Sequence, residues 1–259
     1  MGTDDASPKD ARTVKATKTS FRIIGELKRK SGAGVTEIAT QLDLPKSTVH
    51  KHLTTLQSIN YVVKDDGLYR LSLGFLGLGL AARSHFELVD ISRDPLQKLA
   101  NTTDRTTSLV LLENEYCFHA IRFSPSSADP LPFSVGERLP IHATAGGKAI
   151  MAYLSEDERR GILDRVTLTE LTDQTITDRE TLSEELQEVY DRRQAYDRGE
   201  YIEGLRCIAA PLTGENQRAV GAITVTIQTS EMSNQTINSD IGTFLGSTVH
   251  SIETRLQSQ

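Results

Sequence analysis

Apolar residues between positions 35 and 56 recur at helical spacing in two short blocks. The first block repeats at i, i+3, i+4 and i+7, which is typical of the buried face of a short helix; it consists of Val35, Ile38, Ala39 and Leu42. In the second block, Val49, Leu53 and Leu56 share one helical face. Pro45 separates the blocks and can open a helix, because a first-turn residue has no intrahelical N–H bond to lose. The pattern predicts two short helices joined by a tight turn.

Two β-prone runs follow these helices. Tyr61–Val63 and Leu68–Leu71 flank the sequence Lys64-Asp65-Asp66-Gly67, and Asp-Gly favours a tight hairpin turn. The sequence therefore predicts a β-hairpin, which would be the wing of a winged helix-turn-helix.

A further helix is predicted over Thr19–Lys30, where Phe21, Ile24 and Leu27 share one face. We place the winged helix-turn-helix domain at residues 17–74, after a flexible polar tail at residues 1–16.

The polar side of the second helix lies opposite its apolar stripe. Such a helix can enter the major groove and present short polar and basic side chains to bases and phosphates. The predicted DNA-binding residues are Lys46, Ser47, Thr48, His50, Lys51 and Thr54 on the helix, with Lys64 and Arg70 at the wing. A winged helix that contacts only other proteins is the alternative interpretation.

The distribution of charge favours DNA. Residues 1–72 hold 12 Lys and Arg against 8 Asp and Glu, whereas residues 73–259 hold 17 against 27. A local basic region is typical of a nucleic-acid contact surface. The alternative is a basic surface that is simply solvated. The acidic remainder, in which Arg outnumbers Lys, is compatible with a salt-loving source.

After the hairpin, Leu73 to about Ser92 reads as one strongly apolar helix. A helix that is apolar around much of its circumference needs a partner, so residues 75–92 are interpreted as a linker helix that also pairs subunits. An ordinary core helix is the alternative for part of this length.

Residues 93–259 mix helical and β patterns. A hairpin is predicted at Ser108–Leu112 and Cys117–Phe123, an extended segment at Phe133–Ile141, and capping boxes at Ser155–Glu158 and Thr177–Glu180. Helices on an antiparallel sheet predict an α+β domain.

Composition sets broad limits. No apolar run reaches the ~20 residues that span a bilayer, no secretory signal is visible, and Cys117 and Cys207 cannot form a disulfide framework. We therefore expect a cytoplasmic protein that does not enter membranes. The sequence has no H-E-x-x-H, C-x-x-C, Walker loop or G-x-S-x-G motif, so no catalytic residue, metal site or cofactor is predicted.

One segment does suggest a ligand site. His142-Ala-Thr-Ala-Gly-Gly-Lys148 joins an extended stretch to a helix. Small residues let a ligand approach the backbone, and free N–H groups at a helix start attract anions. Simple packing of the helix entrance is an equally good interpretation of this spacing alone.

Four motifs in this order resemble the IclR family of transcriptional regulators: LPKSTVHKHL, YRLSLGFLGLG, HATAGGKAIMAYL, and GLRCIAAPL followed by GAITVTI. The resemblance implies an N-terminal winged helix and a C-terminal effector domain with a GAF-like fold at residues 93–259. It also implies dimers, often tetramers, and a response to small organic acids.

The resemblance further implies an effector site. The effector carboxylate would lie at the backbone of Ala145 and Gly146, with polar contacts from Asp197, Cys207, Thr224 and Thr226 and with Leu205 as a wall. Family members often carry Ser at the positions of Thr224 and Thr226, so a tighter cavity is expected. The loop Ser124–Pro132 would cap the site.

We therefore expect a homo-oligomeric regulator, not an enzyme, that binds a double-stranded DNA operator and a small carboxylate effector. Two alternatives come from other classes. One is a GAF-type thiol enzyme using Cys207 with Cys117, and the other is a sensor module that works through protein contacts alone.

Overall fold

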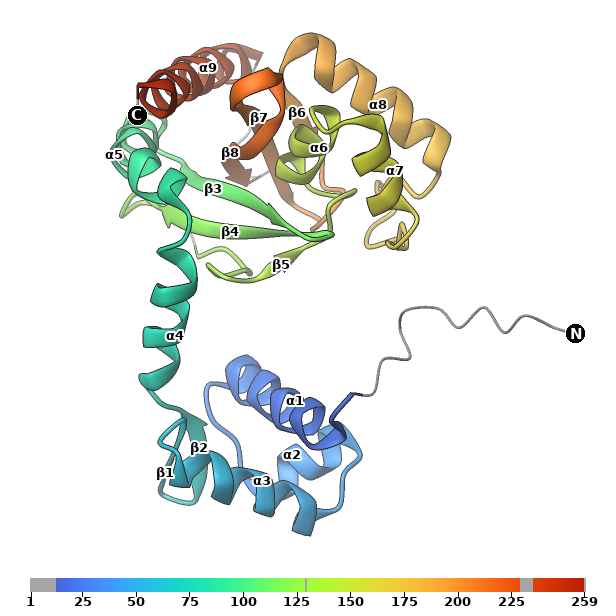
Figure 1. Cartoon of the computed structure of the whole chain (residues 1–259). Coiled ribbons are helices and arrows are strands. Elements are labelled where there is room, and N and C mark those ends of the chain that lie inside the picture. The colour runs from blue at the N-terminus through green and yellow to red at the C-terminus, as the bar shows by residue number, and fades with distance from the viewer. Residues whose placement is uncertain (1–12, 129, 229–234, 259) are drawn as a thin grey trace, which may run out of the picture. The chain divides into compact units, whose positions relative to one another are not determined.

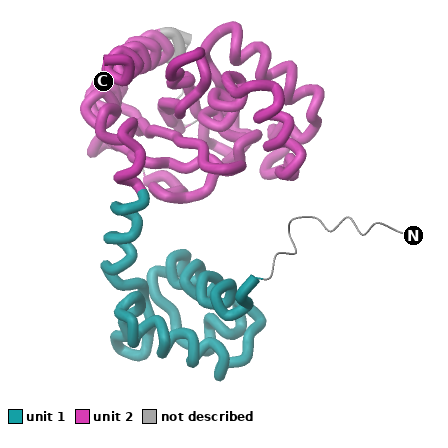
Figure 2. The backbone as a smooth tube through the Cα atoms, viewed as in Figure 1, with its two compact units in different colours: residues 1–82 teal, residues 83–259 magenta. Residues whose placement is uncertain are grey.

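The computed structural model describes residues 13–128, 130–228 and 235–258. The chain divides into two compact units, Met1–Ala82 and Arg83–Gln259 (Figure 2). Most of the predicted tail at residues 1–16 lies outside the described residues, and the finer division of the chain into four segments stays a prediction.

The N-terminal unit contains the predicted winged helix-turn-helix (Figure 1). Its elements are α1 (Lys15–Lys30), α2 (Val35–Leu42), α3 (Lys46–Ser58), β1 (Val62–Asp65) and β2 (Leu68–Leu71). The order and type of all five elements match the sequence prediction, although α1 begins four residues earlier than expected.

The wing depends on its turn. Asp66 and Gly67 have φ values of 44° and 79°, which is the left-handed conformation that a two-residue hairpin turn requires. The turn sets the antiparallel register, in which Asp65 lies opposite Leu68. Ala33 adds a bridge on the other side of β2, exchanging two 2.9 Å backbone hydrogen bonds with Tyr69.

The core of this unit tests the predicted helix faces. Val49, Leu53 and Leu56 of α3 are buried, as predicted. The predicted face of α1 is only partly correct: Leu27 is buried and Ile24 packs against the core, but Phe21 is 65 % exposed and Ile23 is buried in its place. Both stripes have helical spacing, and the i, i+4 pair that can reach α2 and α3 is the one that packs.

The predicted single helix from Leu73 to Ser92 is also wrong. Helix α4 spans Gly74–Arg83, and α5 begins only at Glu87 and runs to Thr103, after an extended Phe86. The physical reason is burial: Leu88 and Val89 are buried in the core of the C-terminal unit, whereas α4 has no buried residue. The first part of the apolar stretch is exposed in α4 and the second part is buried in the core of the C-terminal unit, and the helix breaks between Arg83 and Glu87.

The C-terminal unit is built on one six-stranded antiparallel sheet in the order β5-β4-β3-β8-β7-β6. The strands are β3 (Thr106–Glu113), β4 (Tyr116–Phe123), β5 (Arg138–Leu139), β6 (Ala195–Asp197), β7 (Leu205–Thr213) and β8 (Ala219–Gln228). The extended segment predicted at Phe133–Ile141 shrinks to the two residues of β5.

Helices cover both faces of this sheet, and each face has its own core. Helix α5 packs with α9 (Gln235–Gln257) on one face. The other face carries α6 (Ala145–Ala152), α7 (Glu156–Leu163) and α8 (Arg179–Arg192). The α+β prediction is confirmed.

The two predicted capping boxes have different outcomes. Ser155 and Glu158 form the predicted capping box at the start of α7. The box predicted at Thr177 is wrong, because α8 is capped by Asp178, whose carboxylate accepts a 2.8 Å hydrogen bond from the Thr181 N–H. Among the described residues, no helix has the length and apolar character needed to cross a bilayer.

Candidate functional site

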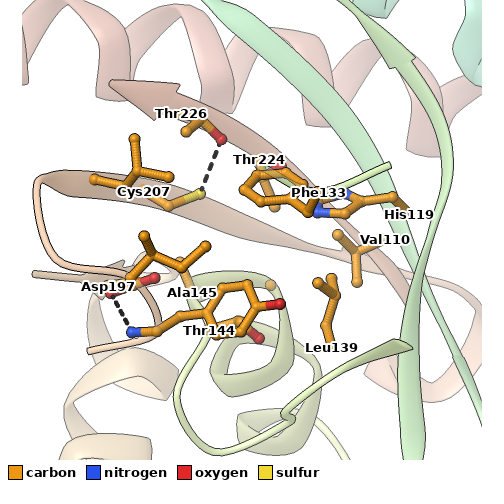
Figure 3. A pocket seen from close by; sticks show the side chains of 14 residues that line it. Val110, His119, Phe133, Leu139, Thr144, Ala145, Asp197, Cys207, Thr224 and Thr226 are labelled. Carbon is orange, nitrogen blue, oxygen red and sulfur yellow. Dashed lines mark hydrogen bonds between the residues drawn. The ribbon is translucent and has the colours of Figure 1, made fainter. Parts of the chain in front are cut away.

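The C-terminal unit contains a small, largely enclosed cavity between the sheet and the start of α6 (Figure 3). Its volume of about 30 Å³ has room for about two water molecules. All seven residues predicted from the sequence as effector contacts line this cavity: Ala145, Gly146, Asp197, Leu205, Cys207, Thr224 and Thr226. The structure therefore brings the predicted set together, while its role in binding stays a prediction.

Strand register explains how distant residues meet there. Asp197 on β6 lies opposite Cys207 on β7, which lies opposite Thr226 on β8. Residues directly opposite in antiparallel strands share a face of the sheet, so these three side chains form one row. Thr224 lies two residues from Thr226 and shares that face, as the alternating pattern predicts.

The start of α6 forms the opposite wall of the cavity. Thr144 is the N-cap, and its hydroxyl accepts a 3.3 Å hydrogen bond from the Gly147 N–H. The first two N–H groups of the helix, those of Ala145 and Gly146, have no intrahelical acceptor. A Cβ on Gly146 would lie 3.0 Å from Val110 Cγ2 and 3.2 Å from Thr224 Cγ2. The strands therefore pack too closely on Gly146 for a side chain there, and Gly146 lines the cavity with backbone atoms alone.

Asp197 is already partly engaged within the protein. Its Oδ1 accepts backbone N–H bonds from Gly199 at 3.0 Å and from Glu200 at 2.7 Å. Burial raises the pKa of the Asp197 carboxyl to about 6, and the nearby Glu200 charge adds to the effect, although the backbone bonds oppose it. The second carboxylate oxygen is the one that can meet a ligand.

A buried ion pair supports this wall. Lys148 of α6 is fully buried, and its Nζ lies 2.7 and 2.8 Å from the two carboxylate oxygens of Glu200. Glu185 lies 3.6 Å from the same Nζ and is itself paired with Arg192 at 3.0 Å. The pair ties the turn after Asp197 to α6. No local sequence pattern predicts this pair, because its partners are 52 residues apart.

Seven residues outside the predicted set of contacts also line the cavity, and of these only Thr144 lies in the segment that the sequence marks as a possible ligand site: Val110, His119, Phe133, Leu139, Thr144, Tyr201 and Ile202. Among these residues, His119 has a titratable side chain that is deeply buried. Its ring stacks on Phe133 with centroids 4.9 Å apart. Burial, aided by the charge of Arg122, lowers the pKa of His119 to about 3. The only sequence signal was its alternation with Cys117 and Ile121 on β4.

The loop that was predicted to cap the site contributes little to it. None of the described residues between 124 and 132 lines the cavity, and the cover comes instead from Phe133, Tyr201 and Ile202.

The two cysteines do not resemble a catalytic pair. Cys117 on β4 and Cys207 on β7 are three strands apart in the sheet, which is on the order of 14 Å. Burial raises the pKa of each thiol to about 12. This opposes the thiolate that nucleophilic chemistry needs. Among the described residues, no cluster of three or more His, Cys, Asp or Glu side chains is suited to a metal ion.

In the N-terminal unit, seven of the eight predicted DNA-binding residues are exposed: Lys46, Ser47, His50, Lys51, Thr54, Lys64 and Arg70. Thr48 is half-buried beside Val49. A histidine outside the predicted set, His52, is also half-buried, and its Nδ1 lies 2.8 Å from Ser20 Oγ of α1. The exposed face of α3 is therefore the polar one.

The two basic residues of the wing differ in their surroundings. The Lys64 ammonium lies 5.1 Å from the centroid of the Tyr69 ring. The Arg70 guanidinium lies 3.4 Å from the carboxylate of Asp65, with both side chains exposed. Arg70 thus has an acidic neighbour that would compete with a phosphate.

Comparison with known proteins finds the same pair of units. The family described as "Bacterial transcriptional regulator IclR C-terminal" matches residues 80–253, and the "IclR helix-turn-helix domain" matches residues 20–66.

Two curated proteins and one solved structure show the similarity in detail. The probable HTH-type transcriptional regulator ArcR of Halobacterium salinarum is 26% identical over 99% of both chains. The HTH-type transcriptional regulator XynR of Escherichia coli is 32% identical over 76% of this chain and 79% of its own. The crystal structure of a putative transcriptional regulator from Rhodococcus sp. RHA1 superposes with a TM-score of 0.79 at 25% identity, over 95% of this chain and 99% of its own.

Proposed function

The chain belongs to the IclR family of bacterial transcriptional regulators, and on that premise we propose that it binds an operator through α3 and the wing and responds to a small carboxylate in the C-terminal cavity. The family combines a helix-turn-helix domain with an effector domain, and both units are present here. The observation that carries the proposal is the exposed polar face of α3, which lies opposite the buried Val49, Leu53 and Leu56.

The proposed DNA contacts follow from exposure and charge. Ser47, Thr48, His50 and Thr54 would read base edges in the major groove, and Lys46, Lys51, Lys64 and Arg70 would hold phosphates. Pro45 is the N-cap of α3 and provides no side-chain hydrogen bond. The Thr48 N–H donates to the Pro45 carbonyl at 2.9 Å, so the N–H groups of Lys46 and Ser47, at the very start of α3, are the ones that would meet a phosphate.

A salt-dependent gel shift with the upstream region of its own gene tests these contacts. Lys51→Ala should weaken binding and reduce the slope of log affinity against log salt by about 0.9, because one counterion fewer is released. Lys98→Ala is the matched control, since Lys98 is an exposed lysine of the C-terminal unit. Equal slopes for the wild type and for Lys46, Lys51, Lys64 and Arg70 variants would contradict the proposal.

The proposed effector is a hydroxy- or keto-acid of a few carbons, and the cavity, which has room for about two water molecules in this structure, would have to widen to hold it. Free N–H groups and the positive end of the α6 dipole favour a carboxylate at Ala145 and Gly146. Asp197 would repel that carboxylate, so it is proposed to accept a hydrogen bond from a hydroxyl or hydrated carbonyl of the ligand. Calorimetry against a panel of such acids tests this, and binding of only neutral or aromatic compounds would contradict it.

We also propose self-association through α4, as a dimer or a higher oligomer. Leu73, Leu76, Leu78 and Leu80 are between 45 and 86 % exposed in the single chain, and an apolar helix of this kind needs a partner. A two-fold dimer would also match an operator with two half-sites. Leu76→Lys should shift the protein toward monomer in light scattering, whereas Leu171→Lys, at an exposed leucine of the C-terminal unit, should not. A monomeric wild type at micromolar concentration would contradict this.

A further inference from the structure

One polar group of the cavity has no role in the proposed anchoring of a carboxylate. His119 is 5 % exposed and lines the cavity. Its Nδ1 has no hydrogen-bond partner anywhere in the part of the chain that the structure describes. A buried polar atom without a partner destabilises a protein, and such atoms are few in native structures. The unpaired nitrogen in a cavity wall therefore points to a ligand atom as its partner.

The position of His119 fixes which part of a ligand it meets. His119 lies directly opposite Val110 in the pairing of β4 with β3, so their Cα atoms are about 4.5–5.5 Å apart. Val110 is also the side chain closest to Gly146, where the carboxylate is proposed to bind. His119 is thus one strand away from the carboxylate anchor, on the side away from β6 and Asp197. The two polar side chains flank the anchor from opposite directions (Figure 3).

The ring is held in place and uncharged. It stacks on Phe133 at an interplanar angle of 7°, and Arg122 Nη1 donates a 2.6 Å hydrogen bond to the Phe133 carbonyl. Burial and the positive charge of Arg122 keep the pKa of His119 far below neutrality. A neutral imidazole nitrogen is either a donor or an acceptor, depending on the tautomer. A hydroxyl can pair with either form, whereas a carboxylate cannot pair with the acceptor form.

We propose that His119 determines specificity by hydrogen-bonding a hydroxyl of the effector, so that the effector is a small dihydroxy acid with hydroxyls on adjacent carbons. One hydroxyl would meet Asp197 and the second would meet His119, on the two sides of the anchored carboxylate. In a 2,3-dihydroxy acid, the C2 hydroxyl and C3 diverge from the same carbon, so the two hydroxyls can point toward different walls of the cavity that both residues line. The inference rests on the proposed function, because it presupposes a carboxylate at the start of α6.

Four three-carbon acids separate the contributions of the two hydroxyls: propanoate, lactate, 3-hydroxypropanoate and glycerate. Binding of each is measured by titration calorimetry to the full-length wild type and to two variants. His119→Leu and His119→Asn have side chains of the same branched shape, but only Asn places a hydrogen-bonding atom near the position of Nδ1. Glycerate should bind the wild type about tenfold more tightly than lactate, since it gains one buried hydrogen bond.

The variants should then diverge. His119→Leu should bind glycerate and lactate equally well, and His119→Asn should keep most of the tenfold difference. Without ligand, His119→Leu should raise Tm by about 2–4 °C, because it removes an unpaired buried nitrogen. A histidine with a merely structural role would instead lower Tm when replaced. If the variants fold poorly, the 15N resonance of wild-type His119 Nδ1 decides, because glycerate should shift it and propanoate should not.

The outcomes that overturn this inference differ from those that overturn the proposed function. Equal binding of glycerate and lactate to the wild type, or an unchanged advantage of glycerate in His119→Leu, overturns the role of His119 and leaves a carboxylate effector intact. If none of the four acids binds, the inference fails together with the proposed small-acid effector, while operator binding is measured separately by gel shift.

Discussion

The polar face of α3 and the wall of the cavity use the same side chains in opposite environments. Lys51 is exposed, whereas Lys148 is fully buried; Asp65 is 73 % exposed, whereas Asp197 is 6 % exposed. Each charged group on α3 and the wing is solvated and depends little on its neighbours. Each one in the cavity wall is held by partners, and its charge affects the stability of the fold. The comparison teaches that the same residue type lies solvated on the surface proposed to bind DNA and is a paired, buried part of the architecture at the cavity.

The largest expected effect separates the two lysines. Lys148→Met leaves the buried Glu200 carboxylate without its partner, and breaking a buried pair in this way costs about 3–5 kcal/mol of unfolding free energy. Lys51→Met removes a solvated charge and should change stability by less than about 0.5 kcal/mol. Denaturant unfolding of both variants measures the difference, and Lys148→Met with Glu200→Gln should recover part of the loss. Comparable stabilities for the two single variants would erase the distinction between the sites.

The second effect tests whether the two regions work independently. Gly146→Val would push side-chain atoms into Val110 and Thr224, against which even a Cβ is tight. We expect effector affinity to fall more than about 100-fold, or about 2.7 kcal/mol, with unchanged affinity for the operator in the absence of effector. Gly161→Ala on α7 is the control, because a Cβ there meets only the end of the Arg165 side chain at 3.6 Å. Loss of operator binding in Gly146→Val would show that the cavity also holds the DNA-binding unit in shape.

The third effect is a dependence on pH that only the buried aspartate should show. The pKa of Asp197 is raised to about 6, so the folded state holds a proton more tightly than the unfolded chain does. This contribution to stability is fully present below the ordinary pKa of about 4 and is lost as the pH rises through about 6. Asp197→Asn should therefore be more stable than the wild type at pH 8 by on the order of 1 kcal/mol, and this advantage should shrink toward pH 4. Thermal unfolding of the wild type and of Asp197→Asn across this pH range measures the difference, and an advantage of the variant that does not change with pH would contradict the prediction.

The smallest effect concerns the wing. Asp65→Asn removes the carboxylate that lies 3.4 Å from Arg70. The guanidinium is then free for a phosphate, and operator affinity should rise about twofold, the scale expected of an exposed ion pair. Gel shifts at low and at physiological salt measure it. A fall in affinity would indicate that Asp65 positions Arg70 and does not compete for it.

The fold of the N-terminal unit could be predicted from the sequence because its signals are local. The stripe of α3 and the Asp66-Gly67 turn each lie within one short segment, and both are confirmed. The stripe of α1 was misassigned because Phe21 and Ile23 both have helical partners, and only packing decides between them. The break at Phe86 was missed because composition does not reveal that one apolar stretch serves two units.

The candidate site could be predicted only where motifs mark it. The segment from His142 to Lys148 has a recognisable composition, and the family resemblance supplied positions such as Asp197. His119 and Glu200 had no such signal, because strand register and a turn bring them to the cavity from distant parts of the chain. Buried polar partners depend on long-range contacts, so a local pattern cannot reveal them.

The cavity and helix α5 lie on opposite faces of one sheet, so a displacement of its strands on the cavity side would also reach the helix. Along β3 and β8, Val110 and Thr224 face the cavity, whereas their chain neighbours Leu109 and Ile223 face the core that contains α5. The Thr107 hydroxyl also donates a 3.0 Å hydrogen bond to the Leu96 carbonyl of α5. A ligand that displaces these strands by a fraction of an ångström thus presses on the helix that follows α4 after three residues. If the proposed effector binds, its signal would leave the cavity as a displacement of the sheet, and a typical coupling free energy of about 1–3 kcal/mol would be carried by the packing on the far face of that sheet.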